Sequence, residues 1–266
     1  MKNSEIRTLL GLHHGFLLST FCTERRTTAH GDLVLSDLIT DPYYNYFCPD
    51  GDGDGGSTRA GLAALTGTWR ERARRPALYT TPLSPAAADG PAGFAPHARD
   101  SWMLREAGPP GTGGTPGVGV RSVGREQRDA FLAAFSAAYS SEDAVELYGP
   151  LEESHVRALA RSFDTSGPED AKFHLLAVSG GRAVGVAVVL VSGSYAGVYA
   201  VGTVAGARRR GVGRALLDAC ADRASGAGAT SLFLQVEAGT GVEQWYRTLG
   251  YRHAFHGTCY VSTAPR

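Results

Sequence analysis

The chain has 266 residues, and its 26 basic and 26 acidic side chains give it a formal net charge of zero. At about 150 residues per domain, this length predicts one large or two small domains. With 43% apolar and 20% charged residues, the composition excludes wholesale disorder. Neutrality also argues against a general DNA binder or a polybasic membrane binder, because both need a positive surface field.

The cysteines and the N-terminal residues indicate a soluble, reduced protein of the cytoplasm. The cysteines lie far apart, at Cys22, Cys48, Cys220 and Cys259. They form no CxxC pair and no Cys/His spacing that suits zinc, so we expect neither disulfides nor a metal site. His13 and His14 interrupt the first apolar run, which excludes a signal peptide. No stretch approaches the roughly 18 apolar residues of a membrane-spanning helix.

The first half contains weakly marked elements. Its apolar periodicity predicts, in chain order, a helix over 4–21, strands over 32–39 and 43–48, a helix over 58–75, and strands over 77–82 and near 101–106. Aromatic residues gather at Tyr43, Tyr44, Tyr46 and Phe47. We expect them to form core, the alternative being an apolar wall for a substrate.

A segment rich in Gly, Pro and Thr, AGPPGTGGTPG at 107–117, separates the halves. Such a segment can hold neither a helix nor a central strand. The sequence therefore predicts an N-terminal α/β domain over 1–106 and a second domain over 118–266.

The second half is clearly patterned. In chain order it predicts a strand over 118–123, helices over 126–139 and 152–163, two strands within 173–191, a strand over 195–204, a helix from 212 to about 226, a strand over 231–236, a helix over 242–250 and a strand over 258–263. Gly180-Gly181 joins the two strands within 173–191 and suits the positive φ angles of a tight hairpin. The fold class is mixed α/β.

The run VGTVAGARRRGVGRALL at 201–217 carries the strongest chemical signal. A strand ends near Thr203 and a helix begins near Gly211, with three arginines between them. Glycine exposes backbone N–H groups, and a helix N-terminus adds unpaired donors and a positive dipole end. A diphosphate fits such a site.

Two common diphosphate loops are excluded. A Walker loop needs GK[ST] after its glycines, and the chain has none. A dinucleotide-binding turn needs a third Gly where this chain has Leu216.

The remaining R-x-x-G-x-G pattern, 208–213, resembles motif A of the GNAT acetyltransferase superfamily. The resemblance covers about 118–264 and implies a GNAT fold with acetyl-CoA as cosubstrate. It implies that the strand end pairs with the pantetheine arm and that the loop and helix start hold the pyrophosphate. These residues are Val201, Gly202, Thr203, Arg208, Arg209, Arg210, Gly211, Val212, Gly213 and Arg214.

A second block, LFLQVEAGTGVEQWYRTLGY at 232–251, resembles the family's Y-x-x-x-G-[FY] segment. The resemblance implies that Tyr246 lies beside the CoA sulfur and protonates the leaving thiolate. Many relatives carry a CoA-contacting Asn seven residues before this tyrosine. Here Gly239 stands at that position, and the neighbouring Thr240 is the candidate substitute.

The resemblance also implies direct attack by a substrate amine, which requires a general base. Glu237 is the candidate, and the alternative is a surface carboxylate. Gln235 stands where some relatives place a catalytic Glu, and it cannot accept a proton. Glu243 is a candidate cap of its short helix.

Two other patterns are better explained without a metal or catalytic site. DGDGDGGS at 50–57 matches part of a calcium loop, but Gly61 stands where a bidentate Glu is required. We interpret it as an acidic loop. His253 and His256 are expected to be ordinary surface residues, with a position facing the acceptor cleft as the alternative.

The first half on its own resembles no family. However, residues 93–104 and 250–261 have the same length and share a Gly, a following aromatic residue and a final apolar triplet. We therefore predict that the first half is a degenerate GNAT-like lobe that shapes the acceptor site, with chance similarity as the alternative. The predicted activity is acetyl transfer to a primary amine of a small molecule, by a monomer or homodimer. The alternatives are an aminoacyltransferase that uses aminoacyl-tRNA and a non-catalytic CoA-binding module.

Overall fold

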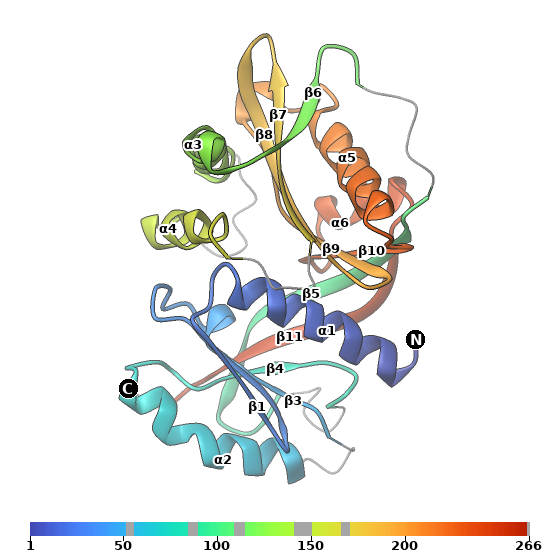
Figure 1. Cartoon of the computed structure of the whole chain (residues 1–266). Helices are drawn as coiled ribbons and strands as arrows, with labels where there is room; N and C mark the ends of the chain where they lie inside the picture. The colour runs from blue at the N-terminus through green and yellow to red at the C-terminus, as the bar shows by residue number, and fades with distance from the viewer. Residues whose placement is uncertain (52–55, 85–89, 109–114, 141–150, 166–170, 265–266) are drawn as a thin grey trace. The chain divides into compact units, whose positions relative to one another are not determined.

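The computed structural model describes residues 1–51, 56–84, 90–108, 115–140, 151–165 and 171–264 (Figure 1). The chain divides into two compact units. Unit 1 comprises Met1–Met103 and Gln235–Arg266, and unit 2 comprises Leu104–Leu234. The last residues of the chain therefore pack with the first. The sequence-based boundary at 107–117 stays a prediction, and 109–114 lie outside the described residues.

Unit 1 contains helices on a largely antiparallel sheet. Its elements are α1 (Asn3–Leu18), β1 (Glu24–Thr28), β2 (Gly31–Leu35), the 3-10 turn η1 (Pro42–Tyr44), β3 (Phe47–Pro49), α2 (Gly56–Glu71), β4 (Ala77–Thr80), most of β5 (Phe94–Glu106), the end of β10 (Ser231–Glu237), α6 (Gly241–Thr248) and β11 (Arg252–Ser262). Six of its strands follow the order β1-β2-β3-β4-β11-β5. The β3–β4 pair is parallel, and β11 pairs antiparallel with β4.

Helix α2 covers one face of this sheet. Leu65 and Trp69 pack against Leu33, Phe47 and their neighbours in a buried cluster. Gly61 allows this close approach, because a Cβ there would lie 2.4 Å from the Phe47 ring. A helix-interior glycine costs about 1 kcal/mol relative to alanine, so this packing offsets a local loss of stability.

A buried acid organises the aromatic core of unit 1. Asp100, 1% exposed, accepts hydrogen bonds from the phenols of Tyr43 at 2.5 Å and Tyr79 at 2.9 Å. The indole of Trp102 in turn donates to the Tyr79 hydroxyl at 2.8 Å. Tyr43, Tyr46 and Phe47 are buried, which confirms the core interpretation for these three residues, whereas Tyr44 is half-buried.

Asp100→Ala is expected to lower the free energy of unfolding by about 3 kcal/mol, because two buried phenols lose their acceptor. Denaturant unfolding measures this change. Asp129→Ala serves as the control, since the Asp129 side chain is 91% exposed and its loss is expected to stay within about 0.5 kcal/mol. Equal effects of the two substitutions would contradict the assignment.

Unit 2 is a sheet with helices on both faces. Its elements are β6 (Gly119–Val123), the 3-10 turn η3 (Arg125–Gln127), α3 (Arg128–Tyr139), α4 (Glu153–Arg161), β7 (Ala171–Ser179), β8 (Arg182–Ser192), β9 (Tyr195–Thr203), the 3-10 turn η4 (Ala205–Ala207) and α5 (Val212–Gly226). The strands follow the order β10-β9-β8-β7-β6. β6 to β9 are antiparallel neighbours, and β10 runs parallel to β9.

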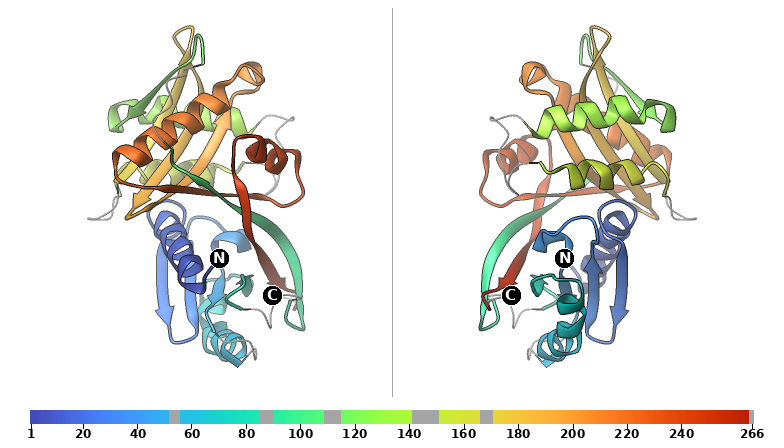
Figure 2. Two further views of the ribbon diagram at one scale, coloured as in Figure 1. Left: turned by 90° about the vertical axis from the view of Figure 1, so that its right-hand side faces the viewer. Right: turned by 90° about the vertical axis from the view of Figure 1, so that its left-hand side faces the viewer.

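The sequence of β8 explains this layering. Residues 186–191 are six consecutive buried apolar residues, as expected for a strand covered on both faces. Helix α5 lies on one face of β7–β9, and α3 lies with α4 on the other (Figure 2). Gly180 and Gly181 have φ angles of 54° and 75° and close the β7–β8 hairpin, as predicted.

Strand β9 contains a bulge near its end. Val188 pairs with Tyr199 and Val186 with Gly202, so β9 carries one more residue than β8 over this interval. Ala200, in the bulge, has a left-handed φ of 51°. Because bulges bend a strand and re-aim its backbone groups, this one sets the direction of Val201, Gly202 and Thr203.

The mixed α/β class is confirmed, with local corrections. The strand predicted over 43–48 is wrong in its first part, where Pro42–Tyr44 form η1, and only Phe47–Pro49 are a strand. Strand β1 was not predicted, and β5 begins at Phe94, well before the predicted 101. Across the described ranges, no helix combines the length and apolar character that crossing a membrane requires.

Candidate active site

The loop between β9 and α5 in unit 2 contains most of the predicted donor-site residues. Strand β9 ends at Thr203, η4 follows, and a turn over 208–211 leads into α5 at Val212. Gly211 is the N-cap residue, with a left-handed φ of 80°. A Cβ at this position would lie 2.7 Å from Thr115 Cγ2. The backbone conformation and the close neighbour together explain why glycine stands there.

The amino end of α5 offers backbone donors. Ala215 N is the first donor of the helical ladder, to Gly211 O at 3.0 Å, so the N–H groups of Val212, Gly213 and Arg214 have no acceptor within the helix. Gly211 has no side chain with which to cap them. Unpaired first-turn N–H groups and the helix dipole favour an anion at this end.

The three consecutive arginines do not behave alike. The half-buried Arg208 donates from Nε to Thr203 O and from Nη2 to Ala138 O, both at 3.3 Å. It therefore links the end of β9 to the end of α3. Arg209 and Arg210 are exposed, as is Arg214. In this structure the charge available to a ligand comes from these exposed residues, and the ligand contact of Arg208 stays a prediction.

Helix α3 also contacts the bulged end of β9. The Tyr139 hydroxyl donates to Val201 O at 3.0 Å, and burial raises the pKa of this phenol above its usual range. Tyr139 therefore remains a neutral donor. A Cβ on Gly202 would lie 2.8 Å from the Tyr139 ring, so the glycine permits this contact.

The remaining predicted residues lie in unit 1, at the end of β10 and on α6. Thr240 is the N-cap of α6 and accepts a hydrogen bond from Glu243 N at 3.3 Å. Its hydroxyl also donates to Glu237 O at 2.9 Å. Capping therefore occupies the Thr240 hydroxyl in this structure, and its contact with CoA stays a prediction.

Tyr246 is held by the C-terminus of α6. Gly250 adopts a left-handed φ of 86°, which lets Tyr251 N donate back to Tyr246 O at 3.2 Å. This bond gives the Y-x-x-x-G-Y spacing a physical basis. The Tyr246 ring is buried and packs edge-on against the Tyr251 ring, with 5.5 Å between centroids.

Glu243 organises the start of α6. Its carboxylate accepts hydrogen bonds from Gly239 N at 2.7 Å, Ser101 Oγ at 3.1 Å and Arg247 Nη2 at 2.6 Å. The bond from Gly239, together with those from Arg247 and Ser101, lowers the pKa of this carboxyl to about 2 despite burial. The cap expectation for Glu243 is confirmed.

Glu243→Gln is expected to destabilise the protein by about 2 kcal/mol at pH 7, because charge-assisted bonds become neutral ones. Since the folded-state pKa lies below the ordinary 4.5, the contribution of Glu243 is complete above about pH 4.5 and declines as the pH falls toward 2. Unfolding measured from pH 7 to pH 3 should show the wild-type advantage shrinking over the acid end. If the difference in unfolding free energy between wild type and Glu243→Gln did not change with pH, this prediction would be wrong.

The candidate base is not distinguished by its surroundings. Glu237, the last residue of β10, is half-buried, and its role as base stays a prediction. Nearby Gln235 has a buried Nε2 with no hydrogen-bond partner among the described residues. This side chain can donate a hydrogen bond but cannot take a proton.

The structure bears only partly on the calcium pattern at 50–57. Residues 52–55, including Asp52, Asp54 and Gly55, lie outside the described part. Asp50 forms an ion pair with Arg7 at 2.6 Å. Within the described ranges, no group of three or more His, Cys, Asp and Glu residues could hold a metal ion.

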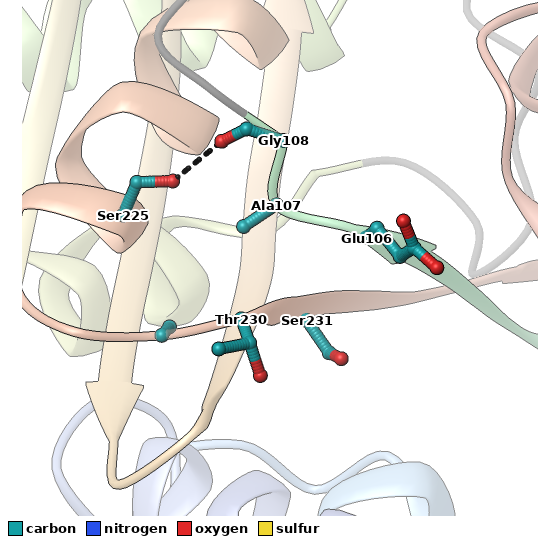
Figure 3. Close-up of a pocket in the computed structure, with 7 residues that line it drawn as sticks. Glu106, Ala107, Gly108, Ser225, Thr230 and Ser231 are labelled. Carbon is teal, nitrogen blue, oxygen red and sulfur yellow. Dashed lines mark hydrogen bonds between the residues drawn. The ribbon is translucent and has the colours of Figure 1, made fainter.

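A pocket of about 450 Å³ in unit 2 lies apart from the predicted residues (Figure 3). Glu106, Gly108, Ser225 and Thr230 are among its lining residues, and Ser225 Oγ donates to Gly108 O at 3.0 Å. Its lining contains an acid and no basic side chain. It is therefore poorly suited to a phosphate-bearing ligand.

Residues 131–251 match the model of the acetyltransferase (GNAT) family. This segment is a GNAT acetyltransferase domain. It contains the β9–α5 loop and Tyr246. A search of curated proteins finds no match.

Solved structures extend the GNAT likeness to the fold of nearly the whole chain. A GCN5-related N-acetyltransferase from Kribbella flavida has a TM-score of 0.67 at 19% identity, over 97% of this chain and 93% of that protein. A tandem GNAT protein from the clavulanic acid biosynthesis pathway has a TM-score of 0.61 at 16% identity, over 89% and 80%. A GCN5-related N-acetyltransferase from Sphaerobacter thermophilus has a TM-score of 0.61 at 17% identity, over 89% and 81%. These likenesses are consistent with a tandem GNAT.

Sequence reasoning missed several supporting residues. Tyr139, Thr115 and Ser101 contact Val201, Gly211 and Glu243 respectively, from distant parts of the chain. No local pattern signals such long-range contacts. The pairing of Thr240 with Glu243 could have been found, because T-x-x-E is the capping-box pattern.

Proposed function

We propose that the protein transfers the acetyl group of acetyl-CoA to a primary amine of a small molecule. The observation that carries the proposal is the uncapped amino end of α5, which follows a left-handed Gly211 within a GNAT domain. The N–H groups of this turn and the exposed Arg209, Arg210 and Arg214 suit the pyrophosphate of CoA.

The bulged end of β9 supports a role in holding the rest of the donor. The register between β9 and β10 runs from Ser231↔Tyr195 to Phe233↔Gly197, while β9 continues to Thr203. An extended ligand such as a pantetheine arm can hydrogen-bond to the backbone at such a strand end. Val201, Gly202 and Thr203 are the residues assigned to this contact.

The proposed chemistry is direct transfer in a ternary complex. The substrate ammonium loses a proton to the base, for which Glu237 is the candidate, directly or through water. The neutral amine attacks the thioester carbonyl, forming the C–N bond as the C–S bond breaks, and the nitrogen then loses its extra proton, which replaces the proton that Tyr246 gives to the sulfur. Backbone N–H groups near Thr203 polarise the carbonyl, and Tyr246 donates a proton to the departing sulfur.

The proposal extends to the setting of the reaction. The four cysteines are free and buried, which supports a reducing compartment such as the cytoplasm. We assign a small-molecule amine as partner, with no requirement for nucleic acid or membrane, and a monomer or homodimer as the active form.

A thiol-release assay with acetyl-CoA over amines, aminoglycosides, amino acids and peptides tests the proposal. We expect release with at least one amine class and acetylation of that amine by mass spectrometry. Ribonuclease destroys aminoacyl-tRNA but leaves acetyl-CoA intact. Activity should therefore survive ribonuclease treatment if acetyl-CoA is the donor. CoA binding without release for any acceptor would overturn the acetyltransferase proposal.

A further inference from the structure

A second pocket, of about 530 Å³, lies within unit 1. It is lined by Arg99 of β5, Gly239 in the loop before α6, Glu243 and Arg247 of α6, and His253 and His256 of β11. The family motifs name none of its basic residues, and the sequence predicted ordinary surface histidines at 253 and 256, with a position facing the acceptor cleft as the alternative.

The charge of this pocket is predominantly positive. Four lining side chains are basic, and Glu243 is the one lining carboxylate. Glu243 forms an ion pair with Arg247, and its single negative charge offsets only one of the lining cations. A ligand in the pocket would therefore meet an excess of positive charge.

The two arginines retain donors for a ligand. Arg247 uses Nη2 for Glu243, and a guanidinium has five N–H donors in all. The Arg247 side chain is 52% exposed. Arg99 is exposed, and within the described part of the chain its guanidinium forms no ion pair. A guanidinium fork of this kind matches the paired oxygens of a carboxylate or phosphate.

The histidines add two titratable donors. Their ring centroids lie 4.3 Å apart, and His256 Nδ1 lies 3.3 Å from the Asp100 carbonyl oxygen. Because that oxygen can only accept, Nδ1 carries the proton and donates to it, which leaves Nε2 as the ring nitrogen available to a ligand. Burial and the neighbouring His256 lower the pKa of His253. An anion beside both rings would raise it.

We propose that this pocket binds a small oxyanion, a phosphate or carboxylate group, through Arg99, Arg247, His253 and His256. Glu243 holds Arg247 in place rather than competing as a ligand. None of Glu237, Thr240 and Tyr246 lines this pocket, so anion binding there can be tested without the proposed acetyl transfer. Binding should strengthen as the pH falls through the histidine range, where the groups that face the ligand are the two arginines, the two histidines and the ionised Glu243.

The test uses the full chain at pH 6.0 and pH 8.0 with inorganic phosphate and with succinate in separate titrations. Imidazole resonances of His253 and His256 give the local readout, because both rings line the pocket. We expect saturable shifts, tighter binding at pH 6.0, and a raised His253 pKa in the bound form. The tighter of the two anions identifies the ligand chemistry.

Arg99→Gln should weaken binding at least about tenfold, the loss expected for one charge-assisted bidentate contact. Arg252→Gln is the matched control, because Arg252 is exposed, adjoins His253 and does not line the pocket. His253→Gln provides a second variant and should reduce the pH dependence. Absence of saturable shifts with both anions, or equal weakening by Arg99→Gln and Arg252→Gln, would overturn the proposal.

Discussion

Tyr246→Phe is expected to lower kcat for acetyl transfer by about 100-fold, the usual scale for removing a general acid. Removal of the hydroxyl leaves the ring, and the backbone bond from Tyr251 N to Tyr246 O does not involve the side chain. KM for acetyl-CoA should change little. Steady-state kinetics with the best acceptor from the amine panel measures both parameters.

The matched control for this prediction is Tyr251→Phe. Tyr251 is also buried, and its ring packs against that of Tyr246. The Tyr251→Phe variant, which also loses a hydroxyl, should keep kcat within a few-fold of the wild-type value. If Tyr246→Phe retained full kcat, with unchanged pH dependence, Tyr246 would not be the acid.

Gly211→Ala is expected to weaken coenzyme A binding by at least about tenfold. A left-handed φ costs a non-glycine residue about 1 to 2 kcal/mol, and the new Cβ would press against Thr115 Cγ2. The turn should relax to another conformation and turn the first amides of α5 away from the phosphate position. Isothermal titration with coenzyme A measures the change.

Gly206→Ala is the control within the same loop. Gly206 lies in η4, and a Cβ there meets no atom within 4 Å. The affinity of the Gly206→Ala variant for coenzyme A should match that of the wild type. Equal affinity of the Gly211→Ala variant and wild type would show that the α5 end does not hold the cofactor's phosphates.

Strongly periodic apolar segments made the second half predictable. Helix α5 and strands β7 to β10 lie where the sequence placed them, because their buried residues recur at helical or strand spacing. Strand β1 was missed because its sequence, ERRTT, has no apolar residue, and only its ladder with β2 makes it a strand. The aromatic run at 43–48 was misjudged because Pro42 and Asp41 start a 3-10 turn, with Asp41 Oδ1 accepting from Tyr43 N.

The site was predicted in outline only. The glycine positions and the tyrosine spacing could be read locally, because both depend on left-handed turns that favour glycine. The inward direction of Arg208 could not be predicted from the local sequence, because it depends on the Ala138 carbonyl at the end of a helix distant in sequence. The bulge at Ala200 was equally hidden, because it is a property of the β8–β9 register rather than of either strand alone.

The pairing of β4 with β11 has a consequence for how the protein is made. Val261 pairs with Ala77 and Thr258 with Thr80, so the strand that pairs with β4 is synthesised long after β4 itself. At about 5 to 20 residues per second, β4 emerges roughly 10 to 40 s before β11. During synthesis the nascent chain therefore carries an open strand edge at β4, and a chaperone that covers such edges should associate with the growing chain and dissociate once β11 has emerged.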